Sequence, residues 1–264
     1  MIIYKTEAEI AAMKRSSQIV AEVLAGLKTM VKPGISTKTL DEYAEAKARE
    51  MGALPAFKGY RGYPASLCAS VNEVIIHGIP SSRVLTEGDI IGLDFGVLFD
   101  GFYGDAAVTV PVGEVSLKTK QLIAAAETAF YKGIAQMRKG NRVSDISHAI
   151  QTYVESQGFS VIRSFVGHGI GHSLHEEPQV ANFGLPGRGP KIKEGLTLAI
   201  EPMIAAGDWQ EEVLEDGWTA VTKDRSWSAH FEHTVGLTPG GVEILSLREG
   251  EEPQVFSSEV NRYA

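Results

Sequence analysis

Four acidic residues occur at the ends or in the middle of strand-like apolar segments, where a carboxylate is unexpected. They are Asp94, Asp105, Glu201 and Glu232. Acids are depleted in strands, and burying an unpaired carboxylate is costly. Each acid alone could face water at a strand end or cap a turn. Taken together, the four carboxylates favour a shared cation site.

The segment "DFGVLFDGFYGD" (94–105) predicts how two of these acids meet. Asp100-Gly101 is a strong two-residue hairpin signal. If these residues form the turn, Asp94 lies opposite Ala107, and Asp105, two residues away, points to the same face. Diagonal neighbours in such a pair lie about 7–8 Å apart. Two carboxylates at this separation repel unless a positive charge lies between them or one is protonated.

Four carboxylates would balance the charge of two divalent cations. Two-metal sites of this kind activate water for hydrolysis. An oxygen-rich ligand set completed by one imidazole indicates Co, Mn, Fe or Zn rather than a thiolate zinc site. The segment "FVGHGIGHSLHEEPQV" (165–180) contains three of the seven histidines. These are either ordinary loop histidines or part of a reaction site.

The bulk composition narrows the class of protein. The chain has 264 residues, a formal net charge of −8 and no long basic run, which argues against a duplex nucleic-acid binder. No stretch approaches the roughly 20 apolar residues of a membrane span, and no signal-peptide pattern opens the chain. A single cysteine, Cys68, excludes an internal disulfide and is ordinarily a small buried hydrophobe. We expect a cytoplasmic protein.

Helices and strands are expected to alternate along the chain. A capping box at Thr6 and Glu9 begins the first helix. Three further helices are expected at 37–51, 117–137 and 144–157, and strands at 73–76, 89–97, 106–110, 196–200 and 229–237. Residues 181–190 are expected to form a loop, and the polar residues 250–264 to be loosely held.

A faint internal repeat accompanies this order. The glycines that frame the second helix, Gly34 and Gly52, recur 106 residues later as Gly140 and Gly158. "EGDIIGLD" (87–94) resembles "EGLTLAIE" (194–201) at an offset of 107. Coincidence is the alternative, but the agreement favours one domain over 1–264, with pseudo-symmetric halves at about 30–110 and 138–248.

These motifs together resemble the type I methionine aminopeptidases in their short bacterial form. The resemblance rests on "HGIP" (77–80), "GHGIG" (167–171), "EEP" (176–178), "EPM" (201–203), "FEHT" (231–234) and the aspartate hairpin, and extends from about residue 3 to 248. It implies the α+β pita-bread fold, in which two pseudo-symmetric halves surround a curved antiparallel sheet with helices on its outer face.

The resemblance also implies a role for each site residue. The five ligands of two metal ions would be Asp94, Asp105, His168, Glu201 and Glu232. The catalytic residues would be His77, His175 and Glu201. The substrate pocket would be lined by Tyr60, Tyr63, Cys68, His77, His175 and Trp218. Phe57 and Leu174 depart from the commonest bacterial pattern, which leaves the pocket's shape open.

The implied activity is removal of the N-terminal methionine of nascent polypeptides when the second residue is small. It implies a monomer with transient ribosome contact, and no DNA or membrane partner. Two alternatives are a proline-specific peptidase and a non-catalytic binding module on the same scaffold. The first usually carries an N-terminal domain, for which the helix beginning at Thr6 leaves no room. The second predicts damaged ligands, and the five are intact.

Four histidines receive no catalytic role from this comparison. We expect His148, His172 and His230 to be ordinary solvent-facing or hydrogen-bonded histidines. His233 is either equally ordinary or orders the carboxylate of Glu232, its neighbour in sequence.

Overall fold

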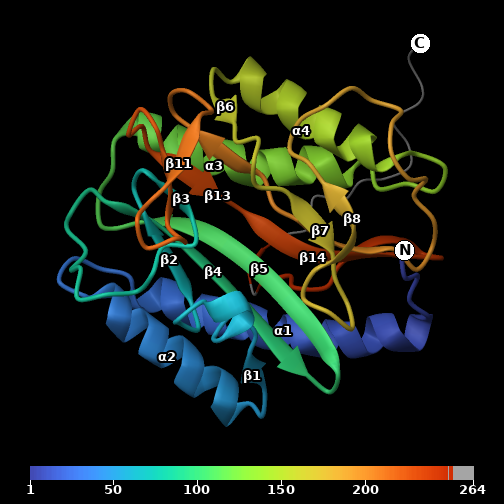
Figure 1. The fold of residues 1–264 in the computed structure, drawn as a ribbon, viewed down its shortest axis with the longest axis horizontal. Helices are drawn as coiled ribbons and strands as arrows, with labels where there is room; N and C mark the ends of the chain where they lie inside the picture. The colour runs from blue at the N-terminus through green and yellow to red at the C-terminus, as the bar shows by residue number, and fades with distance from the viewer. Residues whose placement is uncertain (249, 252–264) are drawn as a thin grey trace.

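A computed structural model describes residues 1–248, 250 and 251. Four α-helices form two pairs within these residues (Figure 1), namely α1 (Glu7–Met30), α2 (Thr37–Glu50), α3 (Leu117–Ile134) and α4 (Val143–Ser156). A short 3-10 helix, η1 (Tyr60–Gly62), lies near the pocket described below. The predicted capping box is present, because the Thr6 hydroxyl accepts from the Glu9 backbone and the Glu9 carboxylate accepts from Thr6. The start of α1 and both ends of the other three helices lie within three residues of the prediction.

A nine-stranded antiparallel sheet runs through the centre of the molecule. Its main path is β1-β4-β5-β14-β9-β7-β8, with β2 added to β4 and β15 to β14. The strands are β1 (Leu54–Pro55), β2 (Cys68–Val71), β4 (Ile90–Phe99), β5 (Phe102–Pro111), β7 (Gly167–Gly169), β8 (Glu176–Val180), β9 (Thr197–Ile200), β14 (Glu232–Thr238) and β15 (Gly241–Ile244).

Two three-stranded sheets flank this one. They consist of β6 (Ser160–Val161), β10 (Met203–Ala205) and β13 (Ser228–His230), and of β3 (Val74–Ile76), β11 (Glu211–Val213) and β12 (Ala220–Thr222). In Figure 1 the main sheet curls, with α1 and α2 along one side and α3 and α4 along the other. This arrangement confirms the predicted α+β pita-bread fold. No helix among the described residues is long and apolar enough to span a bilayer.

The apolar core lies between the helices and the sheet. Buried side chains of α1, such as Val20 and Leu24, belong to the same cluster as Leu93 and Phe95 of β4. The approach of helix to strand is close: a Cβ added at Gly104 on β5 would lie 2.7 Å from the backbone of α1. The helices therefore pack against the outer face of the sheet, and the polar groups of the site lie on its inner face.

The predicted strand at 229–237 is interrupted in the structure. It divides at Phe231 into β13, which pairs with β10, and β14, which joins the main sheet. The Phe231 amide donates instead to the carbonyl of Pro202. The predicted loop at 181–190 contains no helix or strand. Of the predicted loose segment, only Gly250 and Glu251 lie within the described residues.

The glycines of the internal repeat share backbone conformations. Gly34 and Gly140 have φ angles of 93° and 97°, and Gly52 and Gly158 both have φ of 78°. The helices between them, α2 and α4, each contain 14 residues. Left-handed glycines at matching positions are what two copies of one local structure would require. The exact division into halves remains a proposal.

Candidate metal centre and adjoining pocket

Five consecutive strands of the main sheet each supply one of the predicted metal ligands. In the order β4, β5, β14, β9, β7 these are Asp94, Asp105, Glu232, Glu201 and His168, with Glu201 directly following β9. The hairpin has the predicted register, since Asp94 pairs with Ala107, and Ala107 pairs in turn with Glu232. The sheet order thus gathers acids that lie up to 138 residues apart in the sequence.

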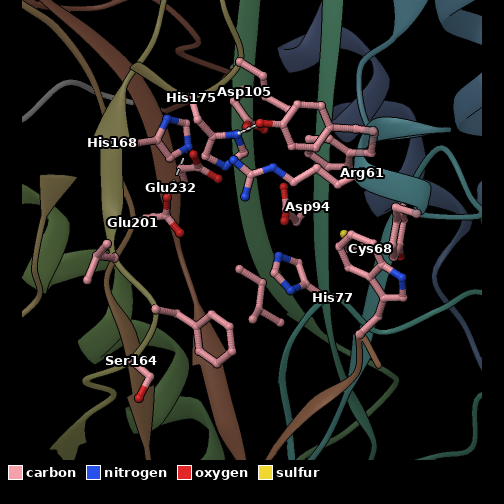
Figure 2. Close-up of a pocket in the computed structure, with 18 residues that line it drawn as sticks. Arg61, Cys68, His77, Asp94, Asp105, Ser164, His168, His175, Glu201 and Glu232 are labelled. Carbon is pink, nitrogen blue, oxygen red and sulfur yellow. Dashed lines mark hydrogen bonds and ion pairs between the residues drawn. The ribbon is translucent and has the colours of Figure 1, made fainter. Parts of the chain in front are cut away.

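The gathered groups form one cluster of polar atoms. One ligand atom from each of Asp105, His168 and Glu232 lies within 4.8 Å of the others, and His168 Nε2 lies 3.5 Å from Glu201 Oε1. Figure 2 shows these side chains and Asp94 pointing into the same space. All five are buried, which is unusual for acids without counter-charges.

Several oxygen atoms of this cluster have no protein partner. Asp94 Oδ1, Asp105 Oδ1 and Glu232 Oε1 are buried and make no hydrogen bond. Buried polar atoms are almost always paired. A divalent cation would satisfy these oxygens and offset the repulsion between the carboxylates, so the side chains fit a metal ion. The buried group of Asp105, His168 and Glu232 can bind one.

The tautomer of His168 suits a metal ligand. Its Nδ1 lies 2.9 Å from the carbonyl oxygen of Gly169. A carbonyl oxygen can only accept, so Nδ1 carries the proton and Nε2 presents its lone pair toward Glu201. Burial, with a smaller contribution from His175, lowers the pKa of His168 to about 3, which keeps the imidazole neutral. A neutral imidazole oriented by a carbonyl is the usual form of a histidine ligand.

The acids of the cluster hold their protons unusually tightly. Burial raises the pKa of Asp94 to about 7. Burial, and then the charge of Asp94, raise the pKa values of Asp105 and Glu201 well above normal, and Glu232 behaves similarly through burial and its neighbour Asp105. A cation would favour the ionised forms and reverse these shifts.

A pocket of about 260 Å³ opens beside the cluster. All six predicted substrate-contacting side chains line it, namely Tyr60, Tyr63, Cys68, His77, His175 and Trp218. Tyr63 and Trp218 meet edge to face with ring centroids 5.1 Å apart. Phe57 and Leu174, the two departures from the commonest pattern, also line the pocket. Aromatic rings and the carboxylates of the cluster thus line the same pocket.

Two neutral histidines stand at the edge of the cluster. Burial lowers the pKa of His77 and of His175 to about 4 each, with a further lowering of His175 by the charge of Arg61. His175 Nδ1 contacts the hydroxyl of Tyr60 at 2.9 Å, and its ring lies 4.2 Å from that of His168. His77 has a left-handed backbone, with φ of 61°, and packs edge-on against Trp218. Both rings therefore have fixed positions facing the pocket.

Sequence reasoning missed three residues of this region. Arg61 lines the pocket with its guanidinium 5.4 Å from the Tyr60 ring centroid, and Phe165 packs edge-on against His77. His230 was expected to be ordinary but is buried at the cluster, 3.8 Å from Glu201. Phe165 directly precedes the "VGHGIG" motif, which could have signalled it. His230 lies two residues before Glu232 in the predicted strand, so alternation along the strand could have placed it on the same face. Arg61 carries no comparable signal.

The remaining histidines lie outside the cluster. His172 contacts Glu9 at 3.1 Å, and exposed His148 contacts the Gly184 carbonyl at 3.2 Å, as expected for ordinary histidines. His233 does not order Glu232. Its ring nitrogens contact the hydroxyl of Ser246 and the guanidinium of Arg248 instead, because successive residues of a strand point to opposite faces.

Comparison with known proteins agrees with this geometry. Residues 11–239 match metallopeptidase family M24. The chain belongs to this family. This metallopeptidase is 50% identical to methionine aminopeptidase 1 of Bacillus subtilis, over 93% of this chain and 99% of that one. It is 52% identical to a methionine aminopeptidase of Clostridium perfringens, over 94% and 99%. The resemblance seen in the motifs is thereby confirmed.

Solved structures agree with the fold of this metallopeptidase. The methionine aminopeptidase of Rickettsia prowazekii superposes with a TM-score of 0.92 at 41% identity, covering 94% of this chain and 100% of that one. A prolidase of Pyrococcus horikoshii superposes with a TM-score of 0.77 at 20% identity, and only 65% of that chain is covered. The second likeness shows a shared fold alone.

Proposed function

We propose that this metallopeptidase removes N-terminal methionine from polypeptides whose second residue is small. The observation that carries the proposal is that a cluster of four buried carboxylates and one imidazole lines the same pocket as several aromatic rings. The relatives at about half identity are methionine aminopeptidases, which supports the choice of substrate.

Two divalent ions would be held by Asp94, Asp105, His168, Glu201 and Glu232. The ions are Co, Mn, Fe or Zn, since a set of four carboxylates and one imidazole suits each of them. When bound, they would supply an activated water and polarise the carbonyl of the first peptide bond. The three unpartnered carboxylate oxygens support the proposed ligand set.

Glu201 acts as the proton carrier of the reaction. It takes a proton from the attacking water and passes it to the leaving amine. Its position supports this role, because the carboxylate is buried at the cluster and also lines the pocket that would receive the peptide. A carboxylate on the pocket wall can reach both the water and the scissile bond.

His175 and His77 act on the substrate rather than on the metals. Tyr60 fixes the His175 ring through Nδ1, which leaves Nε2 to donate to the oxygen of the scissile carbonyl as negative charge develops there. His77 contacts the nitrogen of the scissile amide. The neutral state of both rings supports these roles, since a neutral imidazole offers one N–H and one lone pair.

The aromatic pocket receives the methionine side chain. Tyr60, Tyr63, Cys68 and Trp218 surround an unbranched apolar space, and sulfur packs favourably against aromatic rings. The second residue of the peptide would lie beside His77, where the rings of Phe165 and Trp218 leave little room. We therefore propose a preference for Gly, Ala or Ser there.

The cellular setting belongs to the same proposal. Newly made polypeptides are the source of N-terminal methionine, so we propose a cytoplasmic monomer that contacts the ribosome transiently. DNA and membranes are not proposed as partners, since the chain carries a net charge of −8.

A peptide series tests the proposed function. Metal-loaded protein is incubated with Met-Ala-Ser, Met-Leu-Ser and Ala-Pro-Ser, and products are followed by mass spectrometry. We expect release of methionine from the first peptide, at least tenfold slower release from the second, and no cleavage of the third. Asp94→Ala should abolish activity, whereas the exposed loop variant Asp224→Ala should not change it. Cleavage of Ala-Pro-Ser in preference to Met-Ala-Ser would instead indicate a proline-specific peptidase.

A further inference from the structure

His230 has a buried nitrogen that no protein group satisfies. Its Nε2 makes no hydrogen bond, yet it lies 3.8 Å from Glu201 Oε2 and 3.9 Å from Glu232 Oε2. An unpaired buried donor or acceptor destabilises the fold, so an apolar side chain would be more stable at this position. The nitrogen is therefore expected to serve the cluster it faces.

We infer that His230 is a positioning residue for Glu201, its Nε2–H donating to the Oε2 oxygen and fixing the plane of that carboxylate. This inference rests on the proposed function, in which Glu201 carries the proton. The two oxygens of Glu201 face different imidazoles, because Oε1 lies 3.5 Å from His168 Nε2 and Oε2 lies toward His230. The carboxylate thus lies between a ligand histidine and a positioning histidine.

The backbone holds the His230 ring in this place. Its amide donates to Thr109 Oγ1 at 2.9 Å, and the same hydroxyl donates back to the His230 carbonyl at 2.9 Å. On its other side His230 pairs with Met203 in the small sheet. The backbone that carries the ring is therefore held on both sides.

Side chains alternate between the core and the site through "HFEH" (230–233), as they do along a strand. Phe231 and His233 pack against Phe130 in the core, with ring centroids 5.5 Å and 5.1 Å from it. The alternate residues, His230 and Glu232, both face the carboxylate cluster. The sequence "HFEH" therefore places one proposed ligand and one positioning group on the site face.

The present separation is longer than a hydrogen bond. A contact of 3.8 Å must shorten by about 1 Å to become a hydrogen bond. Hydrogen bonds in active sites are often long in the ligand-free state and tighten in the working complex. A neutral imidazole can carry its proton on either ring nitrogen. With that proton on Nε2, the contact to Glu201 becomes favourable.

Substitution separates a positioning role from a merely structural one. His230→Gln retains an N–H donor of similar reach, and His230→Leu removes it while filling the space. With saturating metal, we expect His230→Leu to lower kcat for Met-Ala-Ser about 10–100-fold, with KM within about twofold. His230→Gln should keep kcat within about threefold. His148→Leu, at an exposed histidine, is the matched control and should match the wild type. Equal rates for His230→Leu and the wild type would overturn the inference.

A spectroscopic readout tests the same inference without catalysis. The imidazole nitrogens of the zinc-loaded wild-type protein are assigned by ¹⁵N NMR, with His230→Gln identifying the His230 signals. We expect a neutral ring with the proton on Nε2, and a metal stoichiometry unchanged in His230→Gln. A proton on Nδ1 with Nε2 bound to zinc would show that His230 is a ligand instead. If the wild type fails to cleave Met-Ala-Ser, the proposed function is wrong. The ¹⁵N NMR spectrum still shows whether the His230 proton lies on Nε2, and so tests the inference separately.

Discussion

Asp105 shows how carboxylates gathered without a cation destabilise the metal-free fold. In the folded chain its pKa lies well above the ordinary value, because the side chain is buried and Asp94 lies beside it. A raised carboxyl pKa means that the folded state favours the protonated form. The group therefore destabilises the metal-free protein increasingly as the pH rises from about 4, its unfolded value, toward the folded value.

Asp105→Asn should therefore stabilise the metal-free protein at high pH. We expect the chelator-treated variant to melt roughly 2–8 °C above the wild type at pH 8, as a difference of about 1–2 kcal/mol produces in a chain of this size. At pH 4 the two should melt alike. Asp224→Asn, at an exposed acid, should show no such gain. A wild type at least as stable as Asp105→Asn at pH 8 would contradict a raised pKa of Asp105 in the metal-free fold.

His175→Ala should separate catalysis from metal binding. Because the proposed role of His175 is to donate to the developing oxyanion, we expect kcat to fall on the order of 10²–10³-fold. Metal stoichiometry, measured by elemental analysis, should stay the same. His172→Ala is the control, since that ring contacts Glu9 on the surface. Loss of metal from His175→Ala, with full activity on adding metal, would make His175 a ligand.

The sequence could predict the acids but not all of their neighbours. A carboxylate inside an apolar strand has a high cost, so its presence is a signal that needs no structure. His230 gives no such signal, because a neutral histidine is tolerated in many places. The available signal was weaker, because alternation along the predicted strand 229–237 puts His230 on the same face as Glu232. Arg61 was missed because an arginine at a pocket edge is ordinary.

At the scale of elements, local sequence signals were sufficient to predict the turn and the register of the β4–β5 hairpin. Asp100 and Gly101 both have positive φ angles, of 51° and 82°, as the predicted turn requires. The turn fixes the register, and the register places Asp94 and Asp105 on one face. No comparable turn signal brings β14 and β9 next to β5, because these contacts join residues far apart in the chain.

The packing of α1 on β5 should be sensitive to a single methyl group. A Cβ at Gly104 would lie 2.7 Å from the Ser17 backbone, so the helix must move. We expect Gly104→Ala to lower the free energy of unfolding by about 1–3 kcal/mol, measured by urea denaturation of the chelator-treated protein. Gly92→Ala, where the nearest atom is 3.4 Å away, is the matched control and should cost less. Equal effects would contradict the close contact.

At the scale of the molecule, the fold was accessible from motifs and the pocket's shape was not. The motif combination predicted the curled sheet and its flanking helices, which the structure confirms. The pocket depends on how Phe57 and Leu174 pack together, and both line it. Such packing is decided by side chains from distant segments, so no local pattern reveals it.

The N-terminus of the chain offers a substrate test. It begins Met1-Ile2-Ile3-Tyr4, with a β-branched second residue. If the site beside His77 excludes bulk, the peptide Met-Ile-Ile-Tyr should resist the metal-loaded enzyme, whereas Met-Ala-Ile-Tyr should lose methionine at least tenfold faster. Mass spectrometry of both peptides checks this. Equal rates would remove the steric argument for a small second residue and leave the metal chemistry untouched.

The central claim is that five side chains from five adjacent strands bind two metal ions. Anomalous diffraction from crystals grown with manganese tests it most directly. The account predicts two anomalous peaks about 3.5–4 Å apart, both among Asp94, Asp105, His168, Glu201 and Glu232. A single peak, or peaks bound by other residues, would contradict the proposed centre.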